Sequence, residues 1–135
     1  AYPLKPELIV QSEYNQYVNT EIWDHFAENY ANALESKLSF NELIQLEIAH
    51  QKVMDFQSEE RFDVIYFDAF AEIHQPEMWT PETLAHVCQF LNPGGVFVTY
   101  AITGNLKRAM KALGFSIEKA PGAPGKREML RATKL

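Results

Sequence analysis

The chain of 135 residues holds a single cysteine, Cys88, and no apolar run that approaches the roughly 18 residues needed to cross a bilayer. One cysteine excludes an internal disulfide and a metal site built from cysteines alone. The sequence contains no G-x-S-x-G nucleophile motif and no phosphate-binding Walker loop, and no glycine-rich loop precedes its apolar strands. These absences predict a cytoplasmic protein with no membrane span, whose residues 1–135 form a single domain or part of one.

Basic residues are scarce in the first three quarters of the chain. Residues 1–103 hold four basic and sixteen acidic residues, whereas residues 104–135 hold eight basic and two acidic ones, within a net charge of -6. Such asymmetry indicates a basic face for a polyanion. The alternative is that these cations only decorate a solvated helix and an edge strand, and the sequence leaves both interpretations open.

Periodicity in the first half predicts two helices and two strands. A short helix is expected after Pro6, and a helix of about four turns is expected behind an N-cap at Thr20. Residues 43–49 alternate between apolar and polar types, which predicts a strand. Residues 62–68 form a nearly continuous apolar run, which predicts a strand buried on both faces of a parallel sheet.

The second half alternates between helix and strand. The run Thr80-Pro81-Glu82 predicts a helix start, and the Pro93-Gly94-Gly95 turn is expected to end that helix. A strand over 96–101 and a helix closed by Gly114 follow. Alternation of strand and helix predicts an α/β fold with a parallel sheet. Alternating residues over 115–119 and 128–133 predict an antiparallel hairpin at the sheet edge.

Asp68 is the first candidate for chemistry, because ligands in open α/β sheets lie at the carboxyl ends of the strands. A carboxylate there can accept hydrogen bonds from an amine or take its proton. The alternative is an aspartate that caps the following turn. Two aromatic residues flank the next loop: Phe70 and Trp79 could stack on a flat heterocycle, or Trp79 could belong to the core.

Lys126 and Arg127 are the second candidates. They follow a loop rich in glycine and proline, where adjacent cations could contact phosphates. The alternative is a solvated entry into the last strand. The basic character of this part of the chain favours phosphate contact.

Four stretches together resemble one known family, the MnmC-type tRNA methyltransferase domain. They are YFDAFA at 66–71, QPEMWT at 75–80, LNPGG at 91–95, and the run from Gly122 to Leu130 that contains GKREML. The opening Ala1-Tyr2-Pro3-Leu4 resembles the segment just past that family's second cofactor motif. The resemblance is strong over 62–131 and diffuse over 5–60.

The resemblance implies a Rossmann-like class I methyltransferase that uses S-adenosylmethionine. Its reaction would be N-methylation of the 5-aminomethyl group on the wobble uridine of tRNA. Asp68 would meet both the methyl donor and the target amine, and Ala69 and Tyr2 would join it in binding the cofactor. Phe70 and Trp79 would line the uracil pocket. Lys126 and Arg127 would meet phosphates of the anticodon stem.

The sequence departs from the family pattern in its cofactor anchors. The glycine-rich motif and the acidic residue that grips the ribose are expected upstream of residue 1, and the Gly-Asp pair expected near 48–55 is replaced by Ala49-His50-Gln51-Lys52. We therefore expect a fragment that binds the cofactor weakly, with a sheet incomplete at its N-terminal side. An open sheet edge predicts pairing of two copies.

Two alternatives remain from other classes of function. One is a binding or scaffolding module that has lost catalysis and kept an RNA-facing surface. The other is a class I methyltransferase that acts on another amine. Retention of Asp68-Ala69-Phe70 argues against the first, and Lys126-Arg127 argues against a small substrate.

Overall fold

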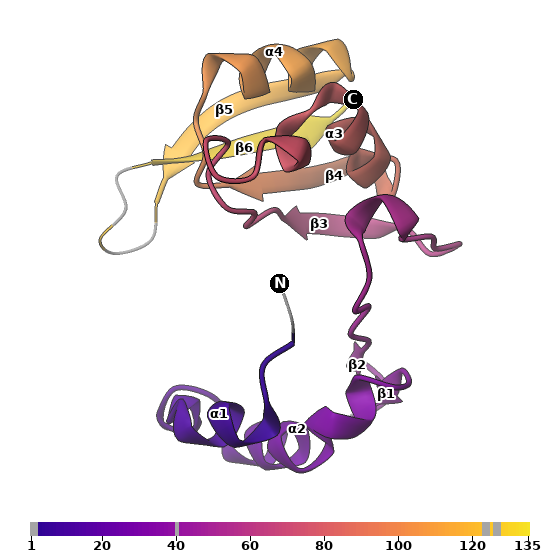
Figure 1. Ribbon diagram of the computed structural model, residues 1–135, viewed down its shortest axis with the longest axis vertical. Coiled ribbons are helices and arrows are strands. Elements are labelled where there is room, and N and C mark those ends of the chain that lie inside the picture. Colours follow the sequence, from indigo (N-terminus) through magenta and orange to yellow (C-terminus); the bar gives the residue numbers. More distant parts are fainter. Residues whose placement is uncertain (1–2, 40, 123–124, 126–127) are drawn as a thin grey trace. The chain divides into compact units, whose positions relative to one another are not determined.

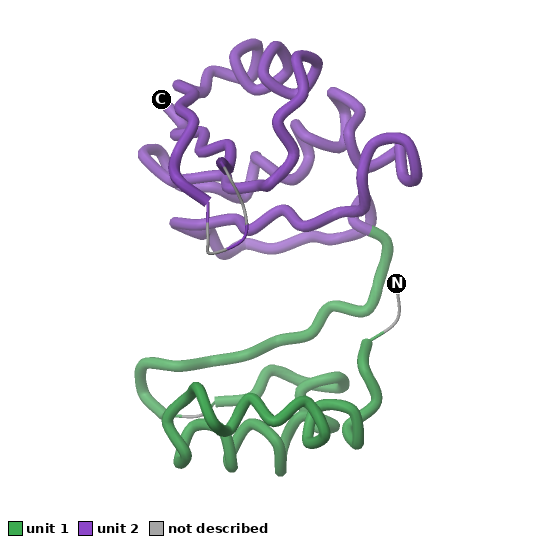
Figure 2. Tube along the Cα trace, turned by 90° about the vertical axis from the view of Figure 1, so that its left-hand side faces the viewer, with its two compact units in different colours: residues 1–52 green, residues 53–135 purple. Residues whose placement is uncertain are grey.

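The computed structural model describes residues 3–39, 41–122, 125 and 128–135. The backbone divides into two compact units, Ala1–Lys52 and Val53–Leu135, which Figure 2 colours separately. Each unit is described by itself below. The prediction of one partial domain over residues 1–135 stays a prediction.

Unit 1 is mainly helical. It contains α1 (Pro6–Gln11), the 3-10 helix η1 (Tyr14–Gln16), α2 (Thr20–Ala33), and the two-residue strands β1 (Leu38–Ser39) and β2 (Gln45–Leu46). Aromatic residues stack along α2 at helical spacing, with ring centroids 5.9 Å apart for Trp23 and Phe26 and 5.4 Å apart for Phe26 and Tyr30. The predicted four-turn helix is therefore confirmed, and Tyr30 and Ala33 are its buried residues.

Two details predicted for unit 1 are wrong. The N-cap of α2 is Asn19 and not Thr20, because the Asn19 side chain accepts a hydrogen bond from the backbone N–H of Ile22 at 3.1 Å. The strand predicted over 43–49 shrinks to Gln45–Leu46. The side chain of Asn41 accepts hydrogen bonds from the N–H groups of Leu43 and Ile44 at 2.8 and 2.9 Å, which turns the chain where the strand was expected to begin.

Unit 2 is an α/β unit built on a four-stranded sheet (Figure 1). Its elements are the 3-10 helices η2 (Val53–Asp55) and η3 (Pro76–Trp79), helices α3 (Pro81–Cys88) and α4 (Gly104–Ala112), and strands β3 (Phe62–Tyr66), β4 (Leu91–Thr99), β5 (Phe115–Pro121) and β6 (Glu128–Lys134). The strand order is β3-β4-β6-β5. Strands β3 and β4 pair in parallel across the α3 connection, and β5 and β6 form the predicted antiparallel hairpin at the edge.

Local chemistry explains where α3 begins. The Thr80 hydroxyl accepts a hydrogen bond from the N–H of Thr83 at 3.1 Å, and Pro81 occupies the first helical position, as predicted. The Thr83 hydroxyl in turn donates to the carbonyl oxygen of Glu77 at 2.7 Å. These bonds join η3 to α3 and fix the chain that returns to the sheet.

The Pro93-Gly94-Gly95 turn does not end α3, contrary to the prediction. The helix ends at Cys88, and β4 has already begun at Leu91. Leu91 pairs with Phe62 and Val96 pairs with Val64, so the turn forms an irregularity inside the parallel pairing. Gly94 has a φ of 79°, and a Cβ on Gly95 would lie 2.8 Å from the carbonyl oxygen of Asn92, so this tight path requires glycine.

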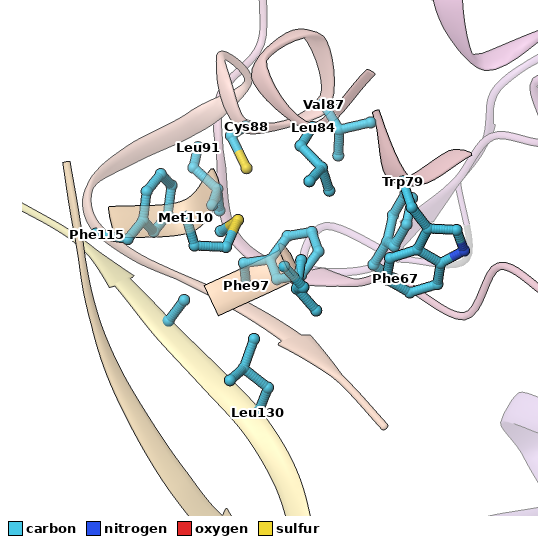
Figure 3. Close-up of a cluster of buried hydrophobic side chains, with 12 residues drawn as sticks. Phe67, Trp79, Leu84, Val87, Cys88, Leu91, Phe97, Met110, Phe115 and Leu130 are labelled. Atoms are coloured by element: carbon cyan, nitrogen blue, oxygen red, sulfur yellow. The ribbon is translucent and has the colours of Figure 1, made fainter. Parts of the chain in front are cut away.

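Burial of β3 on both faces is also not observed. Phe62, Val64 and Tyr66 are exposed, because β3 is the edge strand of the sheet and the helices of unit 2 cover one face only. The core lies between that face and helices α3 and α4 (Figure 3). Its buried members are Phe67, Trp79, Leu84, Val87, Cys88, Leu91, Phe97, Leu106, Met110, Phe115, Leu130 and Ala132.

We expect Leu84→Ala to lower the free energy of unfolding by about 2–5 kcal/mol, because a fully buried leucine leaves a cavity when it is truncated. Ile73→Ala, at a side chain that is 85% exposed, is the matched control and should change stability by less than about 0.5 kcal/mol. Urea denaturation of each variant measures both values. Equal losses for the two variants would contradict the position of the core.

Candidate active site at the carboxyl edge of the sheet

Strands β3 and β4 end at the same edge of the sheet in unit 2, and strand β6 begins there. We call it the carboxyl edge. Strands β3 and β4 are parallel, and the N–H of Phe67 donates to the carbonyl oxygen of Val98 at 2.8 Å, so Asp68 leaves the sheet beside the end of β4. The chain from β4 enters α4 at this edge. Strand β6 runs antiparallel to β4, with Leu130 opposite Thr99, so β6 begins at this edge.

Asp68 is exposed at this edge. Within the part of the chain that the structure describes, its carboxylate takes part in no hydrogen bond or ion pair. The turn that follows is closed by other groups, since the N–H groups of His74 and Gln75 donate to the carbonyl oxygen of Ala71 at 2.8 and 3.0 Å. The carboxylate is therefore available to an incoming amine or ammonium group.

Trp79 is buried, and it contacts the loop that follows Asp68. Its indole N–H donates to the backbone oxygen of Phe70 at 2.8 Å, and its ring packs edge-to-face on Phe67 with centroids 5.2 Å apart. Figure 3 shows the Phe67 and Trp79 side chains together at one end of the core. This position matches the packing alternative, and direct contact between Trp79 and a substrate stays a prediction.

Phe70 projects into solvent with 70% of its surface exposed, while Trp79 holds its backbone. Tyr66 is 81% exposed two residues before Asp68, and the sequence analysis missed it. Its exposure follows from the position of β3 at the edge of the sheet, which the apolar run of residues 62–68 does not reveal. Residues 66–70 thus carry two exposed rings and one exposed carboxylate that has no partner among the described residues.

The remaining predicted site residues are placed in part. Ala69 is half-buried and packs against the core. Tyr2, Lys126 and Arg127 lie outside the described residues. The described ends of the hairpin, Pro121 and Glu128, pair with each other, and Leu130 lies opposite Thr99 at the end of β4.

Cys88 is a core residue on α3. Burial raises the pKa of its thiol from 9.0 to about 12, although the nearby positive charge of Lys134 acts in the opposite direction. The Lys134 ammonium donates to the carbonyl oxygens of Cys88 and Leu91 at 3.1 and 2.8 Å. A neutral, buried thiol is a poor nucleophile, so Cys88 contributes packing.

No group of three or more histidine, cysteine, aspartate or glutamate side chains among the described residues is arranged to hold a metal ion. No helix that the structure describes is long and apolar enough to cross a membrane.

Comparison with known families gives one match over most of the chain. Residues 15–135 match a family described as S-adenosyl-L-methionine-dependent methyltransferase. The chain belongs to this family. The match covers all of unit 2 and most of unit 1, and it names the methyl donor that the family uses.

Curated relatives of this methyltransferase chain carry a more specific name. It is 40% identical over 70 residues to the tRNA 5-methylaminomethyl-2-thiouridine biosynthesis bifunctional protein MnmC of Chromohalobacter salexigens, covering 52% of this chain and 10% of the relative. It is 38% identical over 69 residues to the MnmC of Aromatoleum aromaticum, covering 51% and 11%. The chain therefore spans about a tenth of the length of the curated relatives it matches.

Solved structures agree on the fold. MnmC2 from Aquifex aeolicus superposes with a TM-score of 0.67 at 19% identity, over 83% of this chain and 35% of that one. DesVI from Streptomyces venezuelae superposes with a TM-score of 0.50 at 12% identity, over 63% of this chain and 64% of that one. The predicted α/β, Rossmann-like methyltransferase fold is confirmed.

The residues at the carboxyl edge fit part of S-adenosylmethionine. The cofactor carries cationic ammonium and sulfonium groups, and the unpartnered carboxylate of Asp68 is a group that attracts them. Ala69 follows Asp68 and packs against the core. Binding of the cofactor by Asp68 and Ala69 stays a prediction.

We expect the Cys88 thiol to resist alkylation by iodoacetamide at pH 8 in the folded chain and to react rapidly in denaturant. With a pKa of about 12, the folded thiol is almost entirely protonated at that pH. The unfolded thiol ionises near its ordinary value of 9.0, so the stability that the neutral thiol contributes is present below pH 9 and is lost as the pH rises towards 12. Equal alkylation rates in the two states would contradict its burial.

Proposed function

We propose that this chain takes part in N-methylation of the 5-aminomethyl group on the wobble uridine of tRNA. The observation that carries the proposal is the unpartnered carboxylate of Asp68 at the carboxyl edge, two residues before the exposed ring of Phe70. The names of the curated relatives support tRNA as the substrate. Membership of a methyltransferase family supports the reaction type.

The chemistry gives Asp68 a defined task. When bound, S-adenosylmethionine supplies a methyl group attached to a positively charged sulfur. An alkylammonium has no lone pair, so the target amine must lose a proton before its nitrogen can attack. The Asp68 carboxylate accepts a hydrogen bond from the ammonium and orients it, and it can take the proton. Holding the two reactants in line supplies much of the remaining acceleration.

The neighbouring rings suit a flat base. Phe70 is exposed, and the Trp79 indole holds its backbone in place before any ligand binds. Its ring is therefore free to stack on uracil. Base stacking on an aromatic side chain is worth about 1–3 kcal/mol by alanine substitution. Lys126 and Arg127 are proposed to contact phosphates beside this site, and a cytoplasmic location is proposed because tRNA is the substrate.

We expect Asp68→Asn to slow methyl transfer to tRNA that carries 5-aminomethyl-2-thiouridine by at least about 100-fold, since the amide cannot take a proton. Asp63→Asn is the matched control on the same strand: its side chain accepts from the Asn92 amide at 2.9 Å, far from the carboxyl edge. The methylated nucleoside is measured by mass spectrometry at saturating methyl donor, because weak cofactor binding is expected.

The outcomes separate the competing functions. Equal rates for Asp68→Asn and the parent chain would remove Asp68 from the chemistry. Methylation of small amines without methylation of tRNA would favour a methyltransferase for another amine. Binding of tRNA with no methyl transfer to any amine would favour a non-catalytic RNA-binding module.

Pairing of two copies through the sheet edge stays a prediction. Strand β3 forms one edge of the sheet in unit 2, and its side chains Val64 and Tyr66 are exposed. Open edges with apolar side chains favour pairing with a second strand. Sedimentation analysis should show a dimer for the parent chain and a monomer for Val64→Lys, because a lysine blocks edge pairing. A monomeric parent chain would contradict the prediction.

A further inference from the structure

Helix α4 carries an isolated group of positive charges. From Thr83 to Ile117 the sequence contains no aspartate or glutamate, and the only lysine or arginine residues are Lys107, Arg108 and Lys111. All three lie on α4 (Gly104–Ala112). A stretch of 35 residues therefore concentrates its formal charge on one helix.

The fold presents these cations on the outside of unit 2. Leu106 and Met110 are buried and attach α4 to the core, while Arg108 and Lys111 are exposed and Lys107 is half-buried. Residues three and four apart are neighbours on a helix, so Lys107 and Arg108 both adjoin Lys111. Figure 1 shows α4 packed over β5, at the outer side of the sheet. The three side chains are called the α4 basic face below.

These cations lack the acidic partners that Lys119 and Arg131 of the β5–β6 hairpin have. Lys119 pairs with Glu128 at 2.9 Å, and Arg131 pairs with Glu118 at 3.0 Å. Arg108 instead donates to the neutral Asn105 side chain. Within the described part of the chain, no ion pair involves a residue of the α4 basic face.

A structural role explains only part of the pattern. A cation in the last turn of a helix is stabilised by the helix dipole, which accounts for Lys111. Lys107 and Arg108 lie in the middle of α4, where the dipole gives no such benefit. The helix dipole therefore does not account for these two charges, which are free to meet an anion from outside.

The direction of α4 links this face to the candidate site. The helix starts just after β4 ends, at the carboxyl edge that also holds Asp68. The Arg108 guanidinium reaches back along the helix, with Nη1 3.3 Å from the position of a Cβ on Gly104. The α4 basic face thus begins at the candidate site and extends away from it along the outside of unit 2.

We propose that the α4 basic face binds the phosphate backbone of the RNA whose base enters the site, an inference that rests on the proposed function. Neighbouring cations that form no ion pair with a described residue suit a chain of phosphates, which provides affinity without reading sequence. An anionic membrane is a poorer partner. The apolar residues of α4, Leu106 and Met110, are buried in the core and cannot insert into lipid.

The test compares two triple variants of equal charge. One replaces Lys107, Arg108 and Lys111 with glutamine, and the control replaces Arg61, Lys119 and Arg131, which are exposed cations of unit 2 outside α4. Each variant loses three positive charges, so any effect of net charge alone is the same. Glutamine preserves helix propensity, and circular dichroism checks that α4 still forms.

Binding of unmodified tRNA is measured by fluorescence anisotropy over a range of salt concentrations. At about 0.1 M salt we expect the α4 variant to bind roughly 30- to 100-fold more weakly than the parent chain, and the slope of log K against log salt to fall by about 2. The control variant should lose less than a third of that slope change. Equal losses in the two variants would overturn the proposal.

The remaining outcomes are also decisive. Binding of anionic vesicles through α4, with tRNA binding unaffected, would overturn the proposal in favour of a membrane surface. No tRNA binding by the parent chain would overturn it too. Because the probe carries no reactive amine, α4-dependent tRNA binding without methyl transfer would reject the proposed reaction and leave this inference standing. Methyl transfer with equal binding by both variants would do the reverse.

Discussion

The parallel pairing of β3 with β4 is the constraint on which the rest of unit 2 depends. Parallel strands need a crossover, and the crossover is α3, whose apolar stripe covers the sheet and provides much of the core. Because both strands run in the same direction, their carboxyl ends coincide. The position of Asp68, the entry into α4 and the start of β6 all follow from that coincidence.

The helix ends and the final hairpin of unit 2 could be predicted from the sequence. The Thr80-Pro81 start of α3, the helix closed by Gly114 and the final hairpin are each encoded by nearby residues, and all are confirmed. Asp68 was recognisable because a carboxylate ended an apolar run. These features depend on local periodicity and capping, which a single sequence displays directly.

The wrong predictions concern features that are determined by contacts between residues far apart in the sequence. An apolar run cannot say whether a strand is central or at an edge, so the exposure of Val64 and Tyr66 was missed. Pro93-Gly94-Gly95 looked like a helix stop, but its place is fixed by pairing with β3, 29 residues away at the Asn92–Asp63 contact. The α4 basic face was visible as charge asymmetry only, since the fold was needed to show which cations have acidic partners.

The order of strands in the sheet also bears on how the chain becomes structured. Strand β6 follows every other element of unit 2 in the sequence, yet it lies between β4 and β5. Before β6 joins, β4 and β5 have no strand to pair with between them, and Lys134 is not yet in place to hold the carbonyl groups at the end of α3. During synthesis, an emerging chain can form the β3–α3–β4 crossover early but completes its sheet only after residue 134 has left the ribosome. The sheet of unit 2 is therefore complete only once β6 is available, because β6 is the strand that joins β5 to the β3–β4 pair.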